Sequence, residues 1–109
     1  MTKEEYITKL ETNRKNYPKV LERKNKKYTR KVIKEITKRI KSADLSEQYK
    51  VSEEESRTLF RSKLFDEKLE ELRKKYDFLD IQVIKEIEFR QCKVLIYWDV
   101  KKDEVNNHD

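Results

Sequence analysis

The sequence of 109 residues contains no glycine. Phosphate-binding loops and dinucleotide-binding fingerprints need several glycines at fixed spacings, so both motifs are excluded. The only cysteine, Cys92, rules out an internal disulfide and fits a reducing, cytoplasmic compartment. The sequence shows no signal peptide and no long apolar run, and we therefore expect no membrane-spanning segment.

Residues for catalysis and metal binding are equally scarce. Cys92 and His108 are the only soft metal ligands, and two ligands cannot complete a four-ligand zinc site. A cysteine nucleophile needs a positioned base, and the single histidine lies in the polar C-terminal tail. The acidic run Glu53–Glu55 is typical of a helix start rather than of a magnesium site. We therefore expect a non-enzymatic protein without cofactor or metal.

Charge, by contrast, is abundant and unevenly distributed. Charged residues make up 46% of the chain, and the formal net charge is +6. Residues 1–43 hold 15 Lys and Arg against 5 Asp and Glu, whereas residues 44–109 hold 13 against 17. Such asymmetry indicates that the first part binds nucleic acid or another anionic surface. The alternative is a lysine-rich surface that keeps a small protein in solution.

A one-sided basic helix is the most informative pattern. Between residues 19 and 41, seven cations and no acid recur on one helical face: Lys19, Arg23, Lys27, Arg30, Lys34, Lys38 and Lys41. The opposite face is apolar and carries Leu21, Tyr28, Val32, Ile36 and Ile40. Lysine-rich faces neutralise phosphates without reading bases, so we predict binding to DNA or RNA mainly through the backbone. The alternatives are a solvated outer face or a contact with an acidic protein surface.

Capping and breaking residues divide the first part of the chain. A capping box of Thr2 and Glu5 predicts a helix that ends near Lys15. Pro18 fits the first turn of a second helix, which we expect to end near Ser42. An 11-residue spacing of apolar residues continues across the proline, in the two series Tyr6, Tyr17, Tyr28 and Leu10, Leu21, Val32. This spacing would also suit one helix with a sharp kink at the proline.

The second part of the chain changes from helical to strand periodicity. A connector over residues 44–51 has room for a short edge strand at Tyr49 and Val51. A second capping box, Ser52 and Glu55, predicts a third helix over residues 52–76. Alternating apolar residues over 80–100 then predict an antiparallel hairpin with a loop of three to five residues, because glycine is missing. Residues 101–109 form a polar tail.

Together these elements predict a single α+β domain over residues 1–100, with residues 1–43 as its basic helical part. Three helices pack on a small antiparallel hairpin or three-stranded sheet. The predicted core joins the apolar face of the basic helix to the third helix and the hairpin: Leu21, Tyr28, Val32, Ile36, Ile40, Leu64, Phe65, Leu69, Leu72 and Trp98. The last strand, residues 94–98, is apolar on both faces, so it is either well covered or pairs with a second copy in a homodimer.

Some residues of the apolar arc permit two interpretations. Tyr6, Tyr17 and Tyr28 could stack on exposed bases, but their position favours packing. Arg39 lies with Asn25 inside the arc and needs a partner. An acid of the third helix or hairpin, such as Glu86 or Glu88, or an interface with another chain could supply it, but a local salt bridge or a snorkelling side chain is favoured.

The second half resembles small uncharacterised proteins of phages and large DNA viruses. In that layout a helix leads to a short strand, and a second helix then leads into a hairpin that closes on Ile-x-Trp. The matching residues lie within residues 32–99: Ile36, Ile40, Ala43, Tyr49, Val51, Leu69, Leu72, Tyr76, Ile81, Val83, Ile96 and Trp98. The glycine that often precedes the hairpin is absent, with Asp77 near its place. The resemblance implies a viral origin and transfers no functional residue.

The sequence therefore predicts a nucleic-acid-binding protein of a phage or mobile element, located in the host cytoplasm if viral. The alternative is a protein-binding module, such as an inhibitor of a host or defence factor, or a minor virion component. In that case the basic helix would lie on an acidic protein surface or block a nucleic-acid channel. A basic amphipathic helix could also lie on a membrane, but so small a domain needs the apolar side for its core.

Overall fold

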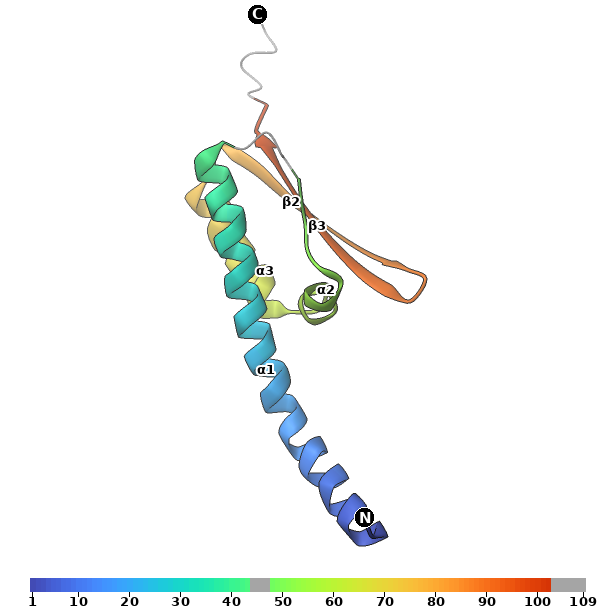
Figure 1. Cartoon of the computed structure of the whole chain (residues 1–109). Helices are drawn as coiled ribbons and strands as arrows, with labels where there is room; N and C mark the ends of the chain where they lie inside the picture. The colour runs from blue at the N-terminus through green and yellow to red at the C-terminus, as the bar shows by residue number, and fades with distance from the viewer. Residues whose placement is uncertain (44–47, 103–109) are drawn as a thin grey trace, which may run out of the picture.

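The computed structural model describes residues 1–43 and 48–102. The order of the elements is α1 (Lys3–Ser42), β1 (Gln48–Lys50), α2 (Glu53–Leu59), α3 (Lys63–Lys75), β2 (Leu79–Glu88) and β3 (Gln91–Val100). Three helices and a three-stranded antiparallel sheet form an α+β fold, as predicted (Figure 1). The predicted connector and tail fall partly on residues 44–47 and 103–109, which lie outside the described residues.

The first part of the chain is one continuous helix rather than two. The predicted capping box is present: Thr2 Oγ1 accepts a hydrogen bond from the Glu5 N–H at 3.2 Å, and the Glu5 side chain accepts one from the Thr2 N–H. The helix then passes through Pro18 without ending, so the predicted break is wrong. Proline removes the bond to the Arg14 carbonyl, but this region is exposed and water can replace that bond. The unbroken 11-residue spacing, rather than the proline, predicted the continuity.

The predicted third helix over residues 52–76 is two helices. α2 ends at Leu59, and α3 begins after Ser62, whose hydroxyl oxygen accepts the Phe65 N–H at 3.0 Å. Ser62 Oγ also donates to Asn25 Oδ1 of α1 at 2.5 Å. This break lets both Leu59 and Phe65 become fully buried, which one straight helix would not allow.

The sheet has the strand order β1-β3-β2. The predicted edge strand is confirmed as β1, in which Tyr49 pairs with Ile96 of β3. The hairpin turn consists of only two residues, Phe89 and Arg90, so the prediction of a longer loop is wrong. Their φ angles are 50° and 64°, the left-handed values that a tight hairpin turn requires. Without glycine this conformation costs about 1–2 kcal/mol per residue, which ten paired positions on each strand offset.

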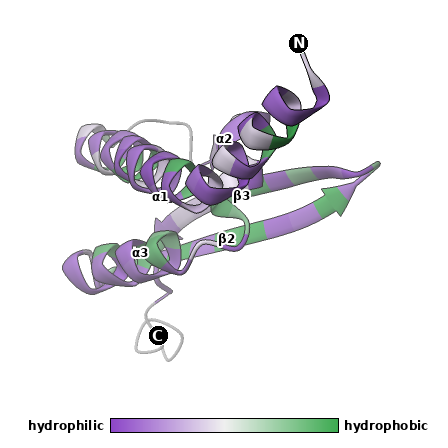
Figure 2. Ribbon diagram, turned by 90° about the horizontal axis from the view of Figure 1, so that it is seen from below, coloured by the Kyte–Doolittle hydropathy of each residue, from purple (hydrophilic) through white to green (hydrophobic). Residues whose placement is uncertain are grey.

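The core lies between one face of the sheet and the three helices. The predicted core is confirmed for most of its members, including Val32 and Ile36 of α1, which are fully buried. It is wrong for Leu21, which is 42% exposed, and for Leu64, which is half-buried and lies outside the core cluster. The prediction also omitted Val51 and Leu59. Figure 2 shows that the ribbons of α1 and α3 are mostly hydrophilic, with few hydrophobic residues. The buried hydrophobic set is Val32, Ile36, Val51, Leu59, Phe65, Leu69, Leu72, Leu79, Ile81, Val94, Ile96 and Trp98.

The doubly apolar strand is the central one. β3 pairs with β1 on one edge and with β2 on the other. Val94 and Ile96 face the helices and are fully buried, while Leu95 and Tyr97 on the other face are half-buried. β2 pairs along the whole of β3, and β1 covers the opposite edge at residues 95–97. The backbone of β3 is therefore paired on both sides over these three residues.

Candidate nucleic-acid interface

The seven predicted cations all lie on α1 and are all exposed. We call this set, from Lys19 to Lys41, the basic stripe. Thr29, Val32 and Ile36, the buried residues of α1, lie on the opposite side of the helix. The core therefore fixes how the helix is turned about its axis and directs the basic stripe towards solvent.

The basic stripe has no internal counter-charge. Within residues 1–43 and 48–102, none of its members forms an ion pair or a side-chain hydrogen bond. Three other cations of the packed part of α1 are paired: Lys26 with Glu22, Lys31 with Glu55 and Arg39 with Glu35. These three are neutralised within the fold, whereas the cations of the stripe are available to an anion.

A groove between α1 and α3 adjoins the stripe. Its volume is about 580 Å³, and Ile33 and Leu64 contribute its apolar lining. Arg30 and Lys34 of the basic stripe line it together with Lys68 of α3. The sequence analysis missed Lys68, because only the long-range packing of α3 against α1 brings it beside the stripe.

The C-terminal end of the stripe lines a second hollow, of about 860 Å³. Lys34, Lys38 and Lys41 contribute to it. Thr37 lies among them, but its hydroxyl donates to the Ile33 carbonyl at 2.7 Å and is therefore already engaged. The lysine ammonium groups are the donors that remain for an anion at this end.

Two contacts between α1 and α2 hold the helix in this orientation. Lys31 Nζ lies 2.6 Å from Glu55 Oε1, and the residue Glu55 is only 5% exposed. Tyr28 Oη donates to Glu54 Oε1 at 2.9 Å. The hydrogen bond to Glu54 raises the pKa of the Tyr28 phenol, and the bond to Glu55 raises the pKa of the Lys31 ammonium. Both contacts therefore favour the protonated forms of the α1 side chains.

Arg39 has the local partner that the sequence favoured. Its Nε lies 3.4 Å from Glu35 Oε1, one turn earlier on α1. Its guanidinium also lies 4.9 Å from the centre of the Tyr49 ring. Glu86 and Glu88 are thus wrong as partners, and the interpretation as a local salt bridge is confirmed.

The described residues offer neither a metal site nor a membrane-spanning helix. Within the described parts of the chain, no group of three or more His, Cys, Asp or Glu residues could hold a metal ion. Cys92 is a free, half-buried thiol, and His108 lies outside the described residues. No helix in residues 1–43 or 48–102 combines the length and the hydropathy needed to span a membrane.

Comparisons of the chain with models of protein families, with curated proteins and with solved structures find no significant match.

Proposed function

We propose that this protein binds nucleic acid by laying the basic stripe of α1 along the phosphate backbone. The observation that carries the proposal is a continuous helical row of seven exposed cations without a counter-ion in the described residues. Each such cation can neutralise one phosphate and release its condensed counter-ion. The proposed role is binding and not catalysis.

The dimensions of the stripe fit a duplex. At 1.5 Å per residue, Lys19 and Lys41 are separated by about 33 Å along the helix axis. This length is close to one turn of duplex DNA, roughly 34–36 Å. Lysine dominates the stripe and acts as a point charge, whereas arginine pairs bidentately with guanine. We therefore propose contacts to the backbone with weak sequence preference.

The proposed biological setting is a phage or mobile element. It is supported by the resemblance of residues 32–99 to small viral proteins. A rival function uses the same stripe on an acidic protein surface, as an inhibitor that competes with nucleic acid or as a minor virion component. A protein ligand and a nucleic acid differ in how steeply affinity depends on salt, which allows a direct test.

Fluorescence anisotropy with labelled duplex DNA, single-stranded DNA and RNA tests the proposal. With six or seven phosphate contacts, affinity should fall by about a thousandfold between roughly 50 and 200 mM salt. The variant Arg30→Glu/Lys34→Glu should abolish binding near physiological salt. Substituting Lys38→Gln alone should lower the slope of log affinity against log salt by about one.

The matched control is Lys101→Glu/Lys102→Glu, which makes the same change in net charge at two exposed residues outside α1 and outside the basic stripe. Its affinity should stay close to that of the unmodified chain. Absence of binding at low salt, or an equal loss in both double variants, would contradict the stripe as the binding surface. In the first case a single protein partner would become the better explanation.

A further inference from the structure

The N-terminal half of α1 carries an apolar stripe that nothing in the described structure covers. Its members, Tyr6, Leu10, Tyr17 and Leu21, follow the 11-residue spacing that continues into Tyr28 and Val32. Tyr6 is 58% exposed, Tyr17 63% and Leu21 42%, whereas Val32 is fully buried. The packing predicted for the three tyrosines is thus present only at Tyr28. One row of apolar side chains is therefore covered at one end and bare at the other.

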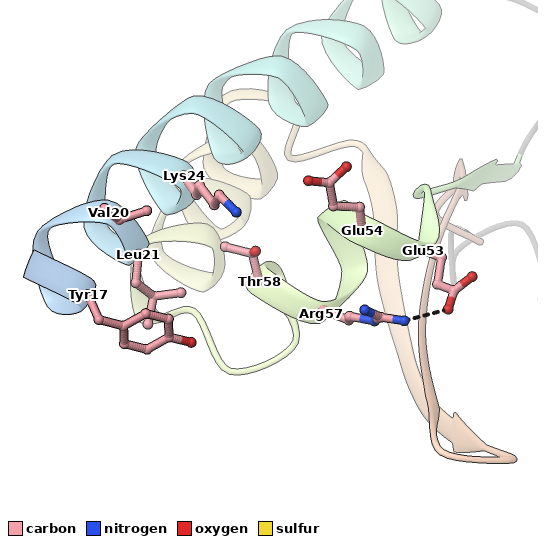
Figure 3. Close-up of a pocket in the computed structure, with 8 residues that line it drawn as sticks. All are labelled: Tyr17, Val20, Leu21, Lys24, Glu53, Glu54, Arg57 and Thr58. Atoms are coloured by element: carbon pink, nitrogen blue, oxygen red, sulfur yellow. Dashed lines mark hydrogen bonds and ion pairs between the residues drawn. The ribbon is translucent and has the colours of Figure 1, made fainter. Parts of the chain in front are cut away.

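Part of the exposed end of this row lines a cleft. Tyr17, Leu21 and their neighbour Val20 form one wall of a cleft of about 740 Å³, and α2 forms the other (Figure 3). The α2 wall contributes Glu53 and Arg57, whose side chains pair at 2.9 Å, together with Glu54 and Thr58. The apolar stripe therefore continues an interface that the fold already uses, since α2 packs on the next turns of the same row.

Charge restricts what can cover the stripe. Arg14 lies between Leu10 and Tyr17 on the same face, and Lys24 continues the row after Leu21. Neither cation forms an ion pair within residues 1–43 and 48–102. Glu4 and Glu11 project from a different side of the helix, more than about a quarter of a turn from the row. A second copy would bring only cations against Arg14 and Lys24, which disfavours self-association.

We propose that the apolar stripe docks an amphipathic helix of another protein whose own apolar row is bordered by Asp and Glu. A helix is the element that can follow a straight row of about 15 residues and insert side chains at the same three- and four-residue spacing. Acids on the borders of that helix would pair with Arg14 and Lys24. The apolar stripe lies roughly a third of a turn from the basic stripe, so the proposal does not depend on nucleic-acid binding.

Two synthetic peptides of about 20 residues test the proposal with the full chain. Both carry leucines at alternating three- and four-residue spacing; one has Glu and the other has Lys on both borders of that row. We expect the Glu-bordered peptide to bind in anisotropy titrations and to protect amides of residues 3–24 from hydrogen exchange, and the Lys-bordered peptide to bind at least about tenfold more weakly. Equal binding of both peptides, or no binding of the first, would overturn the proposal.

Matched variants separate the two stripes and test the role of charge. Tyr17→Asp/Leu21→Asp should lower the affinity for the Glu-bordered peptide by about tenfold or more, as expected when central apolar anchors are lost. Arg14→Glu/Lys24→Glu should reverse the preference between the two peptides. Arg30→Glu/Lys34→Glu, which breaks the basic stripe, should leave peptide binding unchanged. If the Arg14→Glu/Lys24→Glu variant still prefers the Glu-bordered peptide, these two cations do not select the charge of the partner helix, and the proposal of an acidic border is overturned.

Sedimentation equilibrium of the unmodified chain tests the competing occupant. We expect a monomer at micromolar concentration, because the two stripes of a dimer would repel. A dimer that Leu21→Asp dissociates would show that a second copy covers the stripe, and it would overturn the proposal. Nucleic-acid binding could succeed or fail independently of either result.

Discussion

The two halves of α1 share one apolar spacing but have opposite surroundings. Residues 25–42, the packed segment, bury Thr29, Val32 and Ile36 under the sheet and the other helices. Residues 3–24, the projecting segment, include no buried residue, and their N-terminal part extends beyond the other elements (Figure 1). The whole molecule measures 77 × 29 × 21 Å. Amphipathic periodicity is therefore not a measure of burial: the same row of apolar residues serves as core in one half and as free surface in the other.

Truncating one apolar residue in each half should give the largest contrast. Ile36→Ala removes a fully buried side chain and should lower the free energy of unfolding by about 2–5 kcal/mol. Leu21→Ala removes an exposed side chain and should change it by less than about 0.5 kcal/mol. Urea unfolding of both variants measures the contrast. Similar losses would mean that Leu21 is covered in solution.

Replacing the proline within the projecting segment should have a local effect. Pro18→Ala restores a helical hydrogen bond and should stabilise this stretch by up to about 3 kcal/mol, or roughly a hundredfold in amide protection. Hydrogen exchange followed by NMR should show the gain in residues 14–22 and not in the packed segment. A comparable rise in the urea midpoint would instead show that the two segments unfold together.

Removing the N-terminal cap should destabilise only the projecting segment, and by less than the gain expected from Pro18→Ala. Thr2→Ala deletes the side chain that accepts the Glu5 N–H and should cost about 1 kcal/mol in the first turns. Far-UV circular dichroism should record a small loss of helix while the unfolding midpoint stays constant. A shift of the midpoint would contradict independent fraying of this end.

Raising the pH should have the smallest effect on stability, through the Tyr28 and Lys31 contacts at the junction of the two segments. The pKa values of Tyr28 and Lys31 are raised above 10.0 and 10.5 by their hydrogen bonds to Glu54 and Glu55. The folded state therefore holds these protons more tightly than the unfolded state. The stabilisation is complete below about pH 10 and is lost as the pH rises through the folded pKa values. Urea midpoints measured from neutral to alkaline pH should fall, and fall less in Tyr28→Phe.

Local patterns predicted the elements better than their ends. The capping box at Thr2, the edge strand at Tyr49 and the alternation of the hairpin were sufficient to place those elements. The break at Ser62 was missed because part of what stabilises it is a tertiary contact. Ser62 caps α3 and also donates a hydrogen bond to Asn25 of α1, which is distant in the sequence. The tight turn at Phe89 was missed because pairing along two long strands outweighs a local conformational cost.

For the candidate site, sequence periodicity was sufficient to find the basic stripe but not its surroundings. Helical spacing alone placed the seven cations on one face, and the structure exposes all of them. The same periodicity placed Leu21 in the core, because a pattern along one helix does not reveal where neighbouring elements stop. Lys68 joins the groove only through the packing of α3 on α1, for which no motif exists.

The 11-residue spacing along α1 also restricts how this helix can change in length. Each inserted or deleted residue would turn everything before it by about 100° relative to the packed segment. A single insertion near residue 22 would therefore carry Tyr6, Leu10 and Tyr17 away from the side on which α2 lies. An insertion of 11 residues would complete just over three turns and nearly restore the alignment. Functional variants of this helix should accordingly differ in length by multiples of 11 residues, whereas the loops of the protein should tolerate insertions of single residues.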